Sequence, residues 1–494
     1  MDYSAAKTQL RRLEKQLYAL AFADSAIYLD SVTVAPPDTA EGRGEALGEL
    51  SAWEYALFVT DANRELFAFL QACPEAEAPV RREAQLLQKN LDWMTGIPAD
   101  EYAAWSVLLN DAENVWHAAK ANNDFASFAP YLEKIVETSR RFAGYQDASR
   151  PAYDVLLDHY EDGLCMETLD RFFGTLREGV VPIIQAVAER PLADESFFHG
   201  CFPKEGQRAL TWELLQAMGL SKAHLAVAET EHPFQLTFDR QNLRIATHFH
   251  EDDLASGIYS ALHEGGHALY EAGISPEYDY TVLRDELPMS LHESQSRFYE
   301  NYIGRSRAFM TYLLPKLRAF YPDTFASVTE EQLYQAVNRA EPTLIRTEAD
   351  ELTYPLHVMV RYELEKRLLS GDLAVWDLPE AWNALYKAYL GIDVPDDTRG
   401  CLQDSHWAGG MLGYFPSYAL GSAYGAQMLA VMRRTVDVDA AAASGDLSPI
   451  TAWLREHIHT HGALYGPQEI LRRTVGGFDP AYYIAYLREK FLEN

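Results

Sequence analysis

Apolar residues recur every three or four positions along nearly every long segment of this 494-residue chain. That spacing marks one face of an α-helix. Pro98 lies near the first turn of one such segment, and Gly96 ends the segment before it. No internal repeat, low-complexity tract or long linker divides the chain. The sequence therefore predicts a mainly α fold, a single large domain over residues 1–494, with helices at 78–95, 98–121, 166–189, 203–218, 306–320, 355–370 and 478–492.

One stretch departs from the helical pattern, "HPFQLTFDRQNLRIATHF" at 232–249. Gln235 and Thr237, then Leu243 and Ile245, alternate on either side of "DRQN". This pattern predicts a short β-hairpin or edge strands. An edge strand at this place offers an extended peptide a backbone to pair with.

The formal net charge of -31 argues against a nucleic-acid partner and against binding to acidic membrane surfaces. The four cysteines show no CxxC spacing, which favours a reducing compartment. The N-terminal segment is amphipathic and lacks a signal-peptide core, and no apolar run approaches the roughly 20 residues of a membrane span. We therefore expect a cytoplasmic protein.

The segment "SALHEGGHALYEAG", residues 260–273, carries two histidines four positions apart. On a helix, His263 and His267 project from nearly the same face and can take two corners of a zinc tetrahedron. Glu264 then lies beside the metal, where it can handle a water molecule. Gly265 and Gly266 cost a helix roughly 1 kcal/mol each relative to Ala, so we expect something to approach that backbone closely.

A third ligand must come from elsewhere, because the positions for a third-histidine pattern hold Tyr270 and Gly273. Glu293 of "LHESQSRFYEN" is the candidate, 26 residues after the second histidine. A turn at "ISPEYDY" would bring its helix back against the first one. The alternative is a solvated glutamate at a helix start.

A second histidine cluster, "EHIHTHG" at 456–462, is interpreted as structural. His457 and His461 are four apart, but His459 faces away and no carboxylate follows at useful spacing. Histidines near a helix C-terminus also suit the helix dipole.

Beyond these residues, the sequence resembles the carboxypeptidase Taq family of zinc metallocarboxypeptidases. The resemblance rests on "HEGGH" and "HESQ", with "HPF" at 232–234, "IRTEAD" at 345–350 and "GCLQDSHW" at 400–407 followed by "GYFPSYALG". It implies a helical fold with a deep active-site groove, one Zn²⁺ that Co²⁺ may replace, and a homodimer. It also implies release of C-terminal residues from peptides with broad specificity. About 1–200 would form a groove wall, and about 225–425 would carry the catalytic motifs.

Two departures from the family pattern stand out. The Asp-x-Arg-x-Thr motif reads "NLRIA", so that Arg244 stays while Asn242 and Ala246 replace Asp and Thr. Near the N-terminus, Leu29 precedes Asp30 where family members often have Trp. The first departure affects substrate positioning, and neither affects the metal.

The resemblance implies roles residue by residue. His263, His267 and Glu293 become metal ligands, and Glu264 becomes the general base that passes a proton to the leaving amine. His406 and Tyr418 are candidates for stabilising the oxyanion, with a buried structural role as the alternative for each. Asp404 is a candidate for orienting a neighbouring histidine.

An exopeptidase must also recognise a free carboxylate, which suits a guanidinium group. Arg346 is the first candidate and Arg244 the second, with His232 lining the same pocket. The alternative for Arg346 is a helical ion pair with Asp350, four residues away.

The sequence thus predicts a metal-dependent carboxypeptidase acting on peptides with a free C-terminus. Two other functions stay open at this point. One is a zinc oligopeptidase that cuts internally. The other is a non-catalytic helical protein with a structural metal, although Glu264 argues against it.

Overall fold

The predicted helices are present in the computed structural model, which describes residues 2–493. The segment predicted at 78–95 is α4 (Ala78–Gly96), and the one at 98–121 is α5 (Ala99–Asn122). The others form within one or two residues of their predicted starts, except the last, which begins at Ala481 as α22. The predicted mainly α fold is confirmed.

The first half of the chain contains α1 (Tyr3–Thr33), α2 (Ala40–Phe58), α3 (Asp61–Ala72), α4, α5, α6 (Phe125–Asp147), α7 (Ala152–Tyr160), α8 (Met166–Ala188) and α9 (Lys204–Ala217). The second half contains α10 (Leu254–Gly273), α11 (Val282–Asp285), α12 (Met289–Arg297), α13 (Arg307–Phe320), α14 (Pro322–Phe325), α15 (Glu330–Val337), α16 (Tyr354–Ser370), α17 (Leu378–Leu390), α18 (Pro416–Met432), α19 (Val438–Ser444), α20 (Ser448–His457), α21 (Pro467–Val475) and α22 (Ala481–Arg488). Short helical turns are η1 (Pro37–Thr39), η2 (Ser196–Phe198), η3 (Pro276–Tyr278), η4 (Phe298–Ile303), η5 (Arg346–Glu348), η6 (Val375–Asp377), η7 (His459–His461) and η8 (Glu489–Glu493).

A small sheet precedes the helix with the two histidines. The predicted hairpin is present as β2 (Phe234–Asp239) and β3 (Asn242–Thr247), which pair antiparallel. A strand that the sequence did not predict, β1 (Leu225–Glu229), pairs parallel with β3 on its other side. The strand order β1-β3-β2 leaves β2 at an edge of the sheet.

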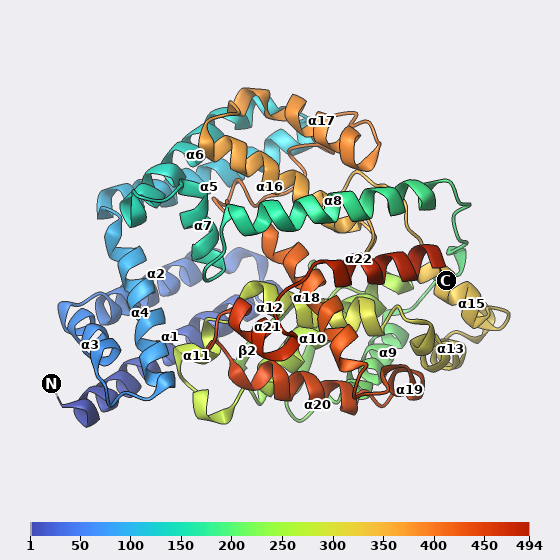
Figure 1. The fold of residues 1–494 in the computed structure, drawn as a ribbon, viewed down its shortest axis with the longest axis horizontal. Coiled ribbons are helices and arrows are strands. Elements are labelled where there is room, and N and C mark those ends of the chain that lie inside the picture. The colour runs from blue at the N-terminus through green and yellow to red at the C-terminus, as the bar shows by residue number, and fades with distance from the viewer. Residues whose placement is uncertain (1, 494) are drawn as a thin grey trace.

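The arrangement of the helices places α10, α12 and α18 near the middle of the molecule (Figure 1). Helices α1 to α4 lie to one side of them, and α5, α6, α16 and α17 lie above. One connected apolar core, from Leu10 of α1 to Leu487 of α22, runs through these helices. The central position of α10 and α12 means that packing from several sides fixes their side chains.

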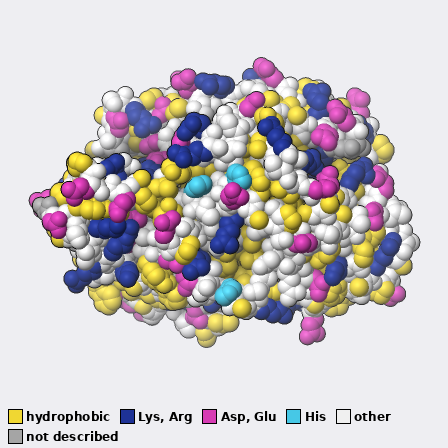
Figure 2. Space-filling view, turned by 60° about the horizontal axis from the view of Figure 1, so that its bottom comes forward, with side chains coloured by type: hydrophobic (Ala, Val, Ile, Leu, Met, Phe, Trp, Pro, Cys, Tyr) yellow, Lys and Arg dark blue, Asp and Glu magenta, His cyan; other side chains and the backbone are white. Residues whose placement is uncertain are grey.

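The surface mixes charges of both signs. Figure 2 shows Lys and Arg side chains interspersed with Asp and Glu over one face, with histidine side chains near its centre. Within residues 2–493, none of the helices combines the length and the apolar character needed to cross a bilayer.

Candidate metal centre and active site

Helix α10 presents His263 and His267 side by side. Asp253 caps the start of the helix by accepting a hydrogen bond from the backbone N–H of Ser256 (3.3 Å). The two imidazole rings lie one turn apart, with centroids separated by 4.9 Å. Glu264, between them in sequence, is 6% exposed. Burial raises the pKa of its carboxyl to about 7, and Glu293 nearby adds to the effect, while His263 lowers it.

Helix α12 brings Glu293 to these histidines. Its Oε2 lies 3.7 Å from Nε2 of His263 and 3.7 Å from Nε2 of His267. The candidate ligand atoms of the three residues all lie within 4.8 Å of one another, and no other such cluster occurs in the described part of the chain. The chain returns to α10 through η3 and α11, at the turn that the sequence indicated. The structure therefore brings the three predicted ligands together.

The donor set fits a divalent transition metal. Two imidazole nitrogens and one carboxylate oxygen are the protein ligands of many catalytic zinc sites, which keep a fourth position for water or substrate. The ring nitrogen of His263 that faces away from Glu293 already has a partner, so Nε2 is left to bind a cation.

Glu300 is that partner. Its Oε2 lies 2.8 Å from Nδ1 of His263 and also accepts a hydrogen bond from Nη1 of Arg297 (3.0 Å). Burial disfavours the charged form of Glu300, but Arg297 and His263 outweigh it and hold the pKa of this carboxyl well below its usual range. An ionised Glu300 keeps the proton of His263 on Nδ1, which fixes the tautomer that a metal ligand needs.

His267 is supported differently, through a second histidine. Its Nδ1 lies 2.5 Å from Nδ1 of His292, and Nε2 of His292 lies 3.3 Å from Oε1 of Glu271. If Nε2 of His267 faces a cation, its Nδ1 must donate to His292, and His292 must then donate to Glu271. These hydrogen bonds thus form a chain of defined tautomers from the candidate metal site to a carboxylate on α10.

Glu293 is oriented by its own helix. Nε of Arg297 donates to Oε1 of Glu293 at 2.7 Å, and Oγ of Ser296 donates to Oε2 at 3.1 Å. Arg297 lies over the ring of Tyr354, 4.7 Å from its centroid. Oε1 is thus fixed to Arg297, while Oε2 accepts from Ser296 and faces the two histidines.

Glycines on α10 and α18 allow this approach, which the sequence led us to expect for the α10 glycines. A Cβ on Gly266 would lie 2.4 Å from the carbonyl oxygen of Gln295, so the backbone of α12 rests directly on α10. A Cβ on Gly421 of α18 would lie 2.9 Å from Cβ of Glu293. Helix α12 is therefore held closely between α10 and α18.

His406 and Tyr418, the oxyanion candidates, lie together. Nε2 of His406 is 3.5 Å from the hydroxyl of Tyr418. Burial lowers the pKa of His406 to about 4, so this ring is neutral at pH 7. Burial raises the pKa of Tyr418 far above its usual value, and the neighbouring Tyr414 and Glu293 add to the effect. Tyr418 also precedes Gly421 by one turn on α18, the helix that contacts Glu293.

Arg346 is held in a buried network. Its Nη2 and Nε donate to Oδ1 of Asp404 (2.9 and 3.1 Å), and its Nη1 donates to the hydroxyl of Tyr354 (3.0 Å). The other oxygen of Asp404 accepts from Nε of Arg361 at 2.6 Å. Two arginines therefore share one carboxylate at this place.

Two interpretations that the sequence left open for this network differ from the structure. Arg346 does not pair with Asp350, because it lies in the short turn η5 and Asp350 instead accepts hydrogen bonds from the backbone of Leu352 and Thr353 (2.9 and 3.0 Å). Asp404 does not orient a histidine. Its oxygens receive the two arginines, while Nδ1 of His406 has no hydrogen-bond partner within residues 2–493.

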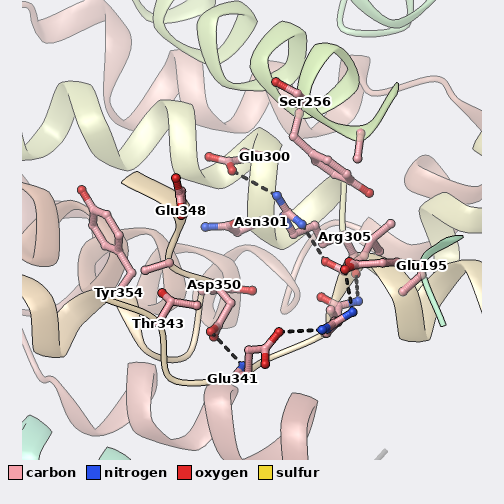
Figure 3. A pocket seen from close by; sticks show the side chains of 18 of the residues that line it. Glu195, Ser256, Glu300, Asn301, Arg305, Glu341, Thr343, Glu348, Asp350 and Tyr354 are labelled. Carbon is pink, nitrogen blue, oxygen red and sulfur yellow. Dashed lines mark hydrogen bonds and ion pairs between the residues drawn. The ribbon is translucent and has the colours of Figure 1, made fainter. Parts of the chain in front are cut away.

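Arg346 lines a cavity of about 500 Å³ behind Glu300, which we call the arginine cavity. Figure 3 shows Glu300, Arg305 and Tyr354 around it, with the ion pair of Glu300 and Arg305 (3.4 Å). Its lining includes Arg297, Glu300, Arg305, Arg346, Asp350 and Tyr354. The side chain of Glu300 therefore lies between this cavity and the predicted metal ligand His263.

Arg244 and His232 lie apart from Arg346. Arg244 is half-buried on β3, where its Nη1 donates to the carbonyl of Leu243 (2.8 Å), and His232 is exposed before β2. Neither lines the arginine cavity. Of the positions that depart from the family pattern, Asn242 begins β3 and Ala246 is fully buried.

Sequence reasoning missed the residues that support the ligands. Glu300 and Arg297 follow Glu293 by seven and four positions, which places them on the same helix face. His292 immediately precedes Glu293. Helical spacing from Glu293 was the available signal for the first two. Glu271 follows His267 by four positions, so the same helical spacing was available for it.

The helical fold, together with a His-Glu-x-x-His helix and a carboxylate on the neighbouring helix, defines a metallopeptidase. The family model for carboxypeptidase Taq (M32) metallopeptidases matches residues 9–491. Carboxypeptidase 1 of Bacillus subtilis (strain 168) is 38% identical over 486 residues, 98% of this chain and 96% of its own. Thermostable carboxypeptidase 1 of Pyrococcus furiosus is 32% identical over 490 residues, 97% of each chain.

Solved structures agree with this relationship. The M32 carboxypeptidase from Deinococcus radiodurans R1 superposes with a TM-score of 0.96 at 33% identity and covers 99% of both chains. Metallocarboxypeptidase 1 of Trypanosoma cruzi superposes with a TM-score of 0.94 at 30% identity, again over 99% of both chains.

The chain belongs to the carboxypeptidase Taq (M32) family of metallopeptidases. It is a metal-dependent carboxypeptidase, a hydrolase that acts on peptides. This confirms the predicted function over the two alternatives, the oligopeptidase and the non-catalytic metal-binding protein.

Proposed function

We propose that His263, His267 and Glu293 hold the divalent cation of this carboxypeptidase, and that the cation is Zn²⁺, which Co²⁺ can replace. The observation that carries the proposal is the convergence of their ligand atoms within 4.8 Å. Nitrogen ligands with one carboxylate suit zinc better than magnesium or calcium, which prefer oxygen ligands. When bound, the cation supplies Lewis-acid chemistry, because it polarises a peptide carbonyl and makes water more acidic.

Glu264 acts as the general base in this proposal. Its carboxylate follows His263 directly and is buried, so it accepts a proton from the attacking water and donates it to the leaving amine. Tyr418 and His406 stabilise the oxyanion. The Tyr418 hydroxyl is the stronger candidate, because its high pKa keeps it protonated and able to donate.

Arg346 receives the C-terminal carboxylate of the peptide. It lines the arginine cavity next to Glu300, so the last side chain of the substrate enters this cavity. Arg244 on β3 remains the second candidate, with His232 just before β2. Because β2 is an edge strand, its free side can hold the peptide backbone by strand addition.

The finer predictions from sequence belong to the same proposal. We propose broad specificity for the released residue, a homodimer, a cytoplasmic location, and a single domain in which residues 1–200 form one wall of the groove. The cysteine usage of the sequence supports the location.

The test compares peptides with free and amidated C-termini on three proteins. Arg346→Met should lower kcat/KM for free peptides about 100-fold, because a charge-assisted contact worth about 2–3 kcal/mol is lost. Arg361→Met is the matched control, since Arg361 shares Asp404 but does not line the arginine cavity. Arg361→Met should lower the stability of the protein about as much as Arg346→Met does. It should keep the preference for peptides with a free C-terminus over amidated ones. Equal loss of that preference in both variants would show that Arg346 acts only through Asp404.

A further inference from the structure

A second large cavity lies between the N-terminal helices and the segment that leads into α12. It has a volume of about 670 Å³ and is lined from α1, α2, α4 and α7 on one side and from residues 282–289 on the other. Figure 1 shows α1, α2 and α4 next to α11 on this side of the molecule. We call it the N-terminal cavity. The mechanism proposed above leaves it unused.

Helix α12 connects this cavity to the metal ligands and to the arginine cavity. Met289 lines the N-terminal cavity, and Glu293 follows it by four residues on the same helix face. Arg297 and Glu300 continue that face and line the arginine cavity. At 1.5 Å per residue, the N-terminal cavity begins about 6 Å before Glu293, and Glu300 lies about 10 Å beyond it. The metal ligand therefore lies between the two cavities.

A row of tyrosine rings connects the same places. Tyr160 lines the N-terminal cavity and contacts Tyr414 edge to face, with centroids 5.4 Å apart. Tyr414 contacts Tyr418 in the same way at 5.3 Å. The wall of the cavity is thus joined, through one intervening ring, to the residue whose hydroxyl is proposed to stabilise the oxyanion.

The wall of the N-terminal cavity is suited to apolar side chains. Trp93 is half-buried and stacks on His159, with ring centroids 3.8 Å apart and planes 15° from parallel. The apolar lining consists mainly of Leu17, Phe58, Leu86, Leu87, Trp93 and Met289.

The basic residues at this cavity are already neutralised. Arg82 and Lys89 both bind Asp162, at 2.6 and 2.8 Å, and Lys89 also lies 3.6 Å from Asp158. They therefore offer little attraction to an acidic side chain. Four further carboxylates also line the cavity and disfavour an acidic side chain: Glu14, Glu54, Asp285 and Glu286. Burial against the apolar lining is the contribution that favours an aliphatic or aromatic side chain.

We propose that the N-terminal cavity binds the substrate residues two to four positions before the scissile bond, with a preference for aliphatic or aromatic side chains. The inference rests on the proposed function, in which the C-terminal residue enters the arginine cavity. An extended peptide covers about 3.3 Å per residue, so the 6 Å from Glu293 to Met289 corresponds to about two residues. The peptide then runs along α12 with its C-terminus toward Glu300.

The experiment measures kcat/KM for blocked peptides that share their last two residues and carry Leu or Asn at the fourth-last position. A blocked dipeptide, which cannot reach the cavity, is the reference substrate. We expect the wild type to prefer Leu over Asn about tenfold, mainly through KM, as burial of one aliphatic side chain allows. Trp93→Ala should reduce this ratio to near one.

Two further variants make the result interpretable. Met94→Gln changes a cavity residue that is 37% exposed, so it preserves folding and should also reduce the ratio. Trp376→Ala removes a ring that is 53% exposed and lies outside the cavity. This variant should leave the ratio of kcat/KM for Leu over Asn unchanged. A wild-type ratio near one, or equal ratios in all variants, would overturn the inference while dipeptide release still supported the proposed function. No release from any peptide would instead refute the proposed function.

Discussion

Two neighbouring glycines on α10 permit a sharp test of how the metal site is built. Gly266→Ala would place a Cβ 2.4 Å from the carbonyl oxygen of Gln295 and 2.7 Å from Cα of Ser296. Both are backbone atoms, and non-bonded heavy atoms settle at about 3.5–4.0 Å. Helix α12 must therefore move away from α10 by about 1 Å. Because Glu293 moves with it, the ligand set opens.

The size of the effect follows from two opposing contributions. Alanine favours the helix by about 1 kcal/mol over glycine, while overpacking a well-packed contact costs about 1–3 kcal/mol. We expect a net loss of about 1 kcal/mol in the free energy of unfolding of Gly266→Ala. Metal ligand distances tolerate only about 0.2 Å, so the metal Kd should rise about 10- to 100-fold, the range typical of lost ligand support.

Gly265→Ala is the matched control. Its Cβ would lie 2.7 Å from Cε of Met218, the end of a flexible side chain that can move aside. We expect an unfolding free energy within about 1 kcal/mol of wild type and an unchanged metal Kd. Denaturant titration of the metal-free protein and competition with a chromophoric chelator measure both quantities. A Gly266→Ala protein that binds metal as tightly as Gly265→Ala would refute the reasoning.

Three further predictions follow from the site. Glu300→Gln should weaken metal binding about 10- to 100-fold, because the fixed tautomer of His263 is lost; an unchanged Kd in a chelator titration would count against this role. Tyr418→Phe should lower kcat about 100-fold or more with little change in KM, measured by steady-state release of a C-terminal residue; an equal rise in KM would indicate a binding role instead. Burial lowers the pKa of His459 to about 3, so the folded state loses stability as pH falls from about 6.5 toward 3. The free energy of unfolding of His459→Gln should fall less over that range, by up to about 4 kcal/mol relative to wild type. The same pH dependence of the unfolding free energy in both proteins would contradict this.

The helices and the three candidate ligands were predictable because their signals are local. Apolar spacing determines which helix face is buried, and a His-Glu-x-x-His pattern places its histidines on one face regardless of the rest of the fold. Glu293 required one further assumption, a turn between two helices, which η3 and α11 provide. For the histidines of "EHIHTHG", the structural interpretation is favoured at His459, which is buried and has its Nε2 2.8 Å from Oε1 of Gln295.

What the sequence did not reveal depends on contacts between distant segments. The strand β1 pairs directly with β3, although β2 lies between them in the sequence, and its short apolar run resembles the helical segments around it. Arg346 finds Asp404, 58 positions away, rather than Asp350, because η5 is a single tight turn and not an α-helix. The His267, His292 and Glu271 chain joins two helices that only packing brings together.

The most direct measurement of the central claim compares Glu264→Gln with Glu293→Gln. For each purified protein, bound metal per chain is determined by atomic emission after dialysis against a limiting Zn²⁺ buffer, together with release of a C-terminal residue. Glu264→Gln should retain about one ion per chain and lose turnover, whereas Glu293→Gln should lose both. Full turnover in Glu264→Gln, or an ion retained with wild-type affinity in Glu293→Gln, would contradict the assignment of base and ligand.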